Sequence, residues 1–189
     1  MLASHLTFGA YGFWLPNDPR GSWSDYVRQR KLLEFGKASK VETKDSVAHL
    51  PHDVALRYNT KKALQFPPVA FDGIQARAVG NGFAIAVKES AYLVFACAIL
   101  PTHVHLVVAV HTNPPRRIIG HFKARATQSL NREGIHPLEN QASPWSVKGW
   151  AVFLDTDDEV FRAIEYVNKN PIKEGLPPQR WKFVVPYVP

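Results

Sequence analysis

The sequence has little cysteine and no long apolar run. Cys97 is the single cysteine among 189 residues, so an intramolecular disulfide and a cysteine-rich zinc site are both excluded. The longest apolar run, residues 91–100, is too short for a helix that spans a membrane, which needs about 20 residues. The start of the chain has no basic segment followed by an apolar stretch of signal-peptide length. We therefore expect a cytoplasmic enzyme or binding protein.

Acidic residues are also outnumbered. Lys and Arg total 23 against 16 Asp and Glu, which gives a formal net charge of +7. This excess favours polyanionic partners, but it does not distinguish DNA from RNA or from an acidic membrane. The hydrophobic fraction of 46% is typical of a folded protein and argues against global disorder.

Hydrophobic patterns predict an α+β protein with a ferredoxin-like core. The order βαββαβ is typical of an antiparallel sheet with two helices on one face, and a further C-terminal helix must pack against that core. Two apolar runs separated only by Pro101 and Thr102 indicate a hairpin of buried, central strands. The predicted strands are residues 6–15, 92–100, 104–110 and 147–154, and the predicted helices are residues 72–89, 115–132 and about 155–170.

We predict a single domain over residues 1–189, with a poorly patterned insertion at about 17–70. This insertion contains a basic cluster of Arg28, Arg30 and Lys31 and one short possible helix near residues 28–35. It is either a long excursion from the core or a recognition arm, and the sequence leaves both interpretations open.

The tripeptide His103-Val104-His105 begins a strongly apolar strand. Residues two apart in a strand point to the same face, with Cα atoms roughly 6.5 to 7 Å apart. Two imidazoles at this spacing can bind one cation. The alternative is that one histidine is a hydrogen-bonded core residue and the other faces solvent.

The final helix carries a tyrosine and an asparagine four residues apart. At about 100° per residue, Val160, Ile164 and Val167 form a buried stripe, and Tyr166 lies about 100° from its near edge. Asn170 lies about 40° from Tyr166, so both can face one site. The alternative is that Tyr166 is a boundary aromatic residue and Asn170 only ends the helix.

Together these segments resemble a known family. AILPTHVHLVV resembles the HUH motif, and IEYVNKNPIKEGL resembles the tyrosine helix of single-tyrosine HUH transposases. The REP-associated tyrosine transposase branch is the most similar. In that branch a tyrosine precedes an Asn-Pro pair, and a small residue follows shortly after. The matching residues here are Tyr166, Asn170-Pro171 and Gly175. The resemblance extends from about residue 92 to residue 176.

The resemblance implies a role for each matching residue. His103 and His105 would bind Mg²⁺ or Mn²⁺, with the side-chain oxygen of Asn170 as a third ligand, a position where related transposases often carry Gln. Tyr166 would attack a DNA phosphorus, leaving a 5′-phosphotyrosine and a free 3′-hydroxyl. The implied substrate is single-stranded DNA with a hairpin. Some relatives exchange the tyrosine helix within a homodimer, so a homodimer is possible and the cis or trans action of Tyr166 stays open.

The predicted helix at residues 115–132 is strongly basic and resembles a basic helix of that family. Its cationic side chains are either solvated or in contact with DNA phosphate, in which case binding weakens steeply with salt. The candidate DNA-binding residues are Arg116, Arg117, Lys123, Arg125 and Arg132.

The first hypothesis is thus a transposase that cuts and rejoins DNA. Two alternatives remain: an HUH nickase of the replication-initiator or relaxase kind, and a domesticated protein that binds nucleic-acid hairpins without cleaving them.

Overall fold

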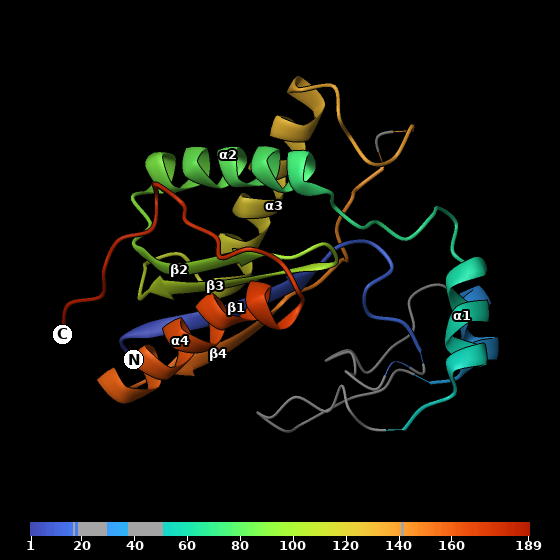
Figure 1. Cartoon of the computed structure of the whole chain (residues 1–189), viewed down its shortest axis with the longest axis horizontal. Coiled ribbons are helices and arrows are strands. Elements are labelled where there is room, and N and C mark those ends of the chain that lie inside the picture. The colour runs from blue at the N-terminus through green and yellow to red at the C-terminus, as the bar shows by residue number, and fades with distance from the viewer. Residues whose placement is uncertain (17, 19–29, 38–50, 141) are drawn as a thin grey trace.

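A four-stranded antiparallel sheet forms the centre of the protein (Figure 1). The computed structural model describes residues 1–16, 18, 30–37, 51–140 and 142–189. The strand order is β2-β3-β1-β4, which together with the chain order confirms the predicted βαββαβ core. The elements are β1 (Ala3–Gly9), the 3-10 helix η1 (Arg30–Phe35), α1 (Val54–Lys62), α2 (Gly73–Ser90), β2 (Val94–Ile99), β3 (His103–Ala109), α3 (Pro115–Arg132), β4 (Trp150–Leu154) and α4 (Asp157–Lys173).

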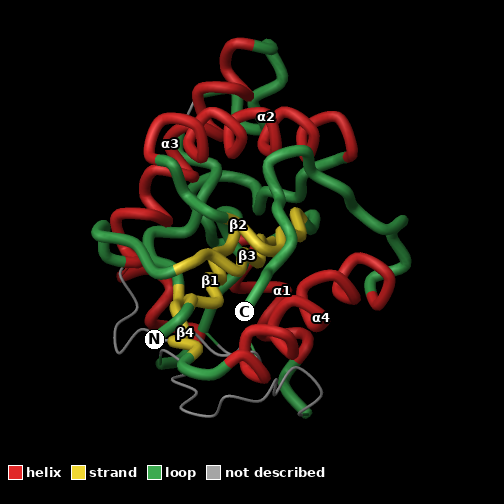
Figure 2. The backbone as a smooth tube through the Cα atoms, turned by 90° about the vertical axis from the view of Figure 1, so that its left-hand side faces the viewer, coloured by secondary structure: helices red, strands yellow, loops and turns green. Residues whose placement is uncertain are grey.

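Helices α2 and α3 cover one face of the sheet, and α4 lies on the other (Figure 2). The α2–α3 side holds the larger apolar core, in which the rings of Phe8, Phe83 and Phe122 are fully buried. Phe83 meets Phe122 edge to face, with ring centroids 5.0 Å apart. On the opposite side, Val107 of β3 packs with Val160 and Val167 of α4. The predicted α+β fold is confirmed, and the C-terminal helix takes the face that the two connecting helices leave open.

Two glycines allow α2 to approach its neighbours closely. A Cβ on Gly82 would collide with the carbonyl oxygen of Arg125 and lie 2.6 Å from the backbone nitrogen of Ala126 in α3. A Cβ on Gly80 would collide with the ring of Trp181. Glycine lowers intrinsic helix propensity, yet α2 forms, with Asp72 and Gln75 completing a capping box at its start. The close packing of helices explains these glycines.

Gly82→Ala is therefore expected to destabilise the protein. Overpacking a backbone contact costs about 2 to 3 kcal/mol, which lowers Tm by roughly 5 to 10 °C in a chain of this size. The control is Gly73→Ala in the same helix, where an added Cβ meets no atom of the described residues within 4 Å. Thermal unfolding of both variants measures the difference, and equal Tm values would contradict the close α2–α3 contact.

Several predicted boundaries were wrong for local reasons. The first strand ends at Gly9 instead of residue 15, because the chain turns at Gly12, where φ is 80°. The strand predicted from residue 147 begins at Trp150. Helix α4 continues past Asn170 through Pro171 and ends where Gly175 adopts a φ of 73° and the N–H of Leu176 donates to the carbonyl of Pro171.

Strand β2 is an edge strand, so only one strand of the predicted hairpin is central. The C-terminal segment covers this edge. The side chain of Gln179 accepts from the N–H of Ile99 at 2.8 Å and donates to its carbonyl at 2.7 Å. Val184 also forms a parallel bridge with Val94. Because the C-terminal segment covers this edge, β2 is buried and its sequence is as continuously apolar as that of a central strand.

The predicted insertion at about 17–70 lies partly outside the described residues, and Arg28 is among those not described. The part that is described contains η1 and α1. Sequence analysis missed α1, although Asp53 caps it by accepting from the N–H of Leu56 at 2.8 Å. In the described part of the chain, no helix combines the length and the apolar character needed to cross a membrane.

Candidate active site

The two histidines of the HxH tripeptide lie at the beginning of β3. His103 and His105 are both buried, with exposed fractions of 9% and 6%. They share the sheet face that α4 covers, because side chains two apart in a strand point the same way. Their ring centroids are 4.9 Å apart, and the rings are nearly perpendicular. β3 thus presents two adjacent imidazoles beneath α4.

Helix α4 carries Tyr166 and Asn170 one turn apart on the face of the sheet where the histidines lie. Its buried residues Val160 and Val167 hold it against the sheet, and Thr156 with Glu159 forms a capping box at its start. Tyr166 is partly exposed at 38%, whereas Asn170, one turn later, is buried at 8%. The amide nitrogen of Asn170 donates to the carbonyl of Tyr166 at 3.0 Å. The amide oxygen of Asn170 is therefore the atom left to meet a ligand.

The phenol ring of Tyr166 lies against the histidine cluster within one chain. Its centroid is 5.5 Å from that of His105, and the two rings are perpendicular. It is also 5.7 Å from the ring of His5, a residue of β1. The ammonium of Lys173 lies 5.2 Å from the centroid of the same phenol. The tyrosine and the paired histidines, about 60 residues apart in sequence, form one site.

Each histidine of the pair uses its Nδ1 atom for a hydroxyl contact. Nδ1 of His105 is 3.0 Å from Oγ1 of Thr7, and Nδ1 of His103 is 3.2 Å from Oγ1 of Thr102. The ring of Phe13 stacks on His103 with centroids 4.6 Å apart. Nε2 of His103 lies 3.9 Å from a carboxylate oxygen of Glu174. These contacts hold both rings in fixed orientations.

Burial favours the neutral form of two histidines of this site, His105 and His5. It lowers the pKa of His105 well below the usual value, and the neighbouring His103 and His5 lower it further. Burial also lowers the pKa of His5 to about 4. Neutral imidazole is the form that binds a metal. The lowered pKa of His105 therefore favours the form that a metal would need.

The residues present fit a divalent metal. Among the described residues, no three or more His, Cys, Asp or Glu side chains gather as metal ligands, so a metal bound by this histidine pair would need a donor of another residue type. The amide oxygen of Asn170 is such a donor, because its amide nitrogen is already engaged. Because the hydroxyl contacts are made at Nδ1, a metal at this site would be bound through Nε2, with an outer hydrogen bond at the other ring nitrogen as in metal-bound histidines.

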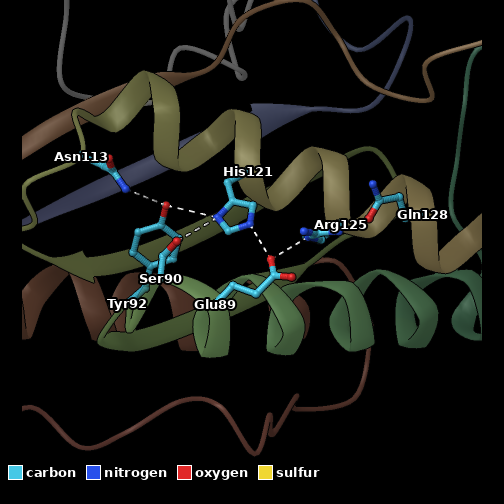
Figure 3. Close-up of polar contacts among 7 residues, drawn as sticks. All are labelled: Glu89, Ser90, Tyr92, Asn113, His121, Arg125 and Gln128. Atoms are coloured by element: carbon cyan, nitrogen blue, oxygen red, sulfur yellow. Dashed lines mark hydrogen bonds and ion pairs between the residues drawn. The ribbon is translucent and has the colours of Figure 1, made fainter.

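The basic helix lies away from this site. α3 packs on the sheet face opposite α4, so its cationic residues do not join Tyr166 and the histidines. Arg125 donates to the carboxylate of Glu89 at 2.7 Å, and the same carboxylate contacts His121 at 2.9 Å (Figure 3). These polar side chains therefore tie α3 to the end of α2.

The other basic residues of α3 differ in whether their side chains make hydrogen bonds within the protein or lie exposed. Lys123 donates to the carbonyls of Ser146 and Lys148 at 2.7 and 2.9 Å, and burial lowers its pKa to about 8. Arg132 donates to the hydroxyl of Ser129. Arg116 and Arg117 lie exposed in the first turn of the helix.

Sequence reasoning missed several residues of the site. His5 and Thr7 alternate along β1 on the face that carries the pair, but the predicted strand began at residue 6. The spacing of two between His5 and Thr7 was the sequence signal that could have placed both side chains on one face of a strand. Lys173 and Glu174 follow the proline at which the helix was expected to stop.

No family model and no curated protein matches this chain. Among solved structures, it is similar to a REP-associated tyrosine transposase bound to a REP hairpin. The two sequences are 11% identical, and the TM-score is 0.46. The similarity covers 92% of this chain and 68% of the other.

Proposed function

We propose that this chain is a metal-dependent transposase-type strand transferase that cleaves and rejoins single-stranded DNA near hairpins through a 5′-phosphotyrosine. The observation that carries the proposal is the contact between the phenol of Tyr166 and the imidazole of His105, with ring centroids 5.5 Å apart in one chain. The motif resemblance of both segments adds to it. Because α4 packs on the sheet of its own chain, Tyr166 acts in cis in this proposal.

The proposed reaction transfers one phosphoryl ester. The phenol oxygen of Tyr166 forms a bond to a backbone phosphorus, the bond from that phosphorus to the 3′ oxygen breaks, and the phenol proton is released as the 3′-hydroxyl forms. Rejoining reverses these steps with a 3′-hydroxyl as the attacking group. The ester bond is conserved throughout, so no ATP is consumed.

Mg²⁺ or Mn²⁺ would be held by Nε2 of His103, Nε2 of His105 and the amide oxygen of Asn170. The ion would act as a Lewis acid on a phosphoryl oxygen and stabilise the charge that grows in the transition state. The chain itself orients the nucleophile, since the phenol ring is bracketed by His105, His5 and the ammonium of Lys173. That exposed ammonium is placed to attract the phosphate backbone to the phenol.

Contacts from α3 to DNA phosphate are part of this proposal. Arg116 and Arg117 suit the role best, because both are exposed at the first turn of the helix. Lys123, Arg125 and Arg132 would have to exchange hydrogen bonds within the protein for contacts with phosphate. A DNA strand that reaches both α3 and Tyr166 must pass around the edge of the sheet, which suits a hairpin with a single-stranded extension.

The test is incubation with a labelled single-stranded hairpin DNA and Mn²⁺, followed by a denaturing gel. We expect a covalent protein–DNA adduct that is absent when EDTA removes the metal, and religated product when a strand with a free 3′-hydroxyl is added. Hairpin binding without an adduct would replace this proposal with a non-cleaving hairpin-binding protein. Cleavage that never yields joined strands would favour a nickase.

A further inference from the structure

His5 of β1 lies between the candidate metal ligand and the candidate nucleophile. The sheet register pairs His5 with Val107 and Thr7 with His105, so His5 lies one pleat from His105 on the face that α4 covers. The residue is half-buried there. The proposed reaction places its ring beside the phenol but gives it no role toward His105.

A hydrogen bond joins His5 directly to the histidine pair. Nε2 of His5 is 3.1 Å from Nδ1 of His105, and Oγ1 of Thr7 contacts the same Nδ1 atom. If Nε2 of His105 binds a metal, its Nδ1 carries the proton and needs an acceptor. His5 and Thr7 are the two acceptors at that atom. Together they set the tautomer and the rotation of the His105 ring.

His5 also contacts the phenol. Its ring meets that of Tyr166 at 66°, with centroids 5.7 Å apart, an edge contact within the range that aromatic rings prefer. The same imidazole lies 5.2 Å from the ring of His105. One side chain thus touches both parts of the site, through a nitrogen atom on one side and a ring on the other.

We propose that His5 is a positioning residue that orients His105 for metal binding and holds the ring of Tyr166 in place for attack. This inference rests on the proposed function. It assigns two separable roles to one side chain, and two substitutions separate them. His5→Phe keeps an aromatic ring beside Tyr166 but removes the nitrogen. His5→Gln keeps a hydrogen-bonding group beside His105 but removes the ring.

The experiment measures Mn²⁺ affinity by electron paramagnetic resonance, and the rate of adduct formation at saturating Mn²⁺. We expect His5→Phe to weaken Mn²⁺ binding about 10-fold, because an outer partner of a metal ligand is lost while Thr7 remains. We expect His5→Gln to bind Mn²⁺ within about 3-fold of the wild type but to form the adduct about 10-fold more slowly. His52→Phe, outside the sheet, is the control and should change neither quantity.

The outcomes separate this inference from the function on which it rests. A wild type that binds Mn²⁺ and forms the adduct, with both His5 variants equal to it, would overturn the role of His5 alone. A wild type that binds no Mn²⁺ would overturn the metal site and, with it, this role. Equal losses of both quantities in the two variants would indicate a merely structural histidine and also count against the proposal. If His5→Phe does not fold, His5→Gln still tests the phenol contact.

Discussion

Tyr166→Phe is expected to form no detectable covalent adduct with hairpin-bearing single-stranded DNA, a loss of at least about 1000-fold in rate. Phenylalanine keeps the ring that contacts His5 and His105, so the packing of α4 on the sheet is preserved. It lacks the oxygen that attacks phosphorus. Mn²⁺ affinity and DNA binding are expected to stay at wild-type values, because the ring supplies neither metal ligands nor phosphate contacts.

Tyr58→Phe is the matched control for this substitution. Tyr58 lies exposed on α1 with the ammonium of Lys62 4.4 Å from its ring centroid, an environment similar to that of Tyr166 beside Lys173. This variant should form the adduct at the wild-type rate. Persistence of the adduct in Tyr166→Phe would assign the nucleophile to another residue.

His105→Ala is expected to lower Mn²⁺ affinity more than 100-fold and to prevent adduct formation. Loss of an outer partner alone costs about 10- to 100-fold in metal affinity, and loss of the coordinating imidazole itself costs more. His103→Ala should act in the same way, since its ring lies 4.9 Å from that of His105 and is the second proposed ligand. Binding of hairpin DNA should remain, because it depends mainly on phosphate contacts. Calorimetric titration with Mn²⁺ and a denaturing gel measure the two effects.

His121→Ala separates loss of stability from loss of metal. His121 links Glu89 to the hydroxyl of Tyr92 on the opposite side of the sheet, and its removal breaks a polar network between α2 and α3 (Figure 3). This variant should melt at a lower temperature than the wild type yet bind Mn²⁺ with the same affinity. A His105→Ala protein that still binds Mn²⁺ as the wild type does would contradict the proposed metal site.

The predictable part of the site is the part that depends on local periodicity. A spacing of two in a strand determines that His103 and His105 share a face, and a spacing of four in a helix places Tyr166 near Asn170. Both relations follow from the geometry of a single element. The βαββαβ order could also be predicted from local pattern, because the helices show a hydrophobic period and the hairpin strands show continuous apolar runs.

The unpredictable part depends on pairing between distant segments. His5 lies beside His105 only because β1 pairs with β3 in one register, and no local pattern determines that register. The hydrogen bonds from Lys123 to the carbonyls of Ser146 and Lys148 likewise depend on where the loop before β4 packs. The sequence left the basic helix either solvated or in contact with DNA, and it did not show that Lys123, Arg125 and Arg132 make hydrogen bonds within the protein.

The most direct test of the account is mass spectrometry of the peptide that retains DNA after the wild-type protein has reacted with hairpin DNA and Mn²⁺ and been digested. The account predicts a nucleotide phosphate linked to Tyr166, at the site where the phenol meets the imidazoles of β3. A nucleotide on any other residue, or a fully folded wild-type protein that retains no DNA, would contradict it.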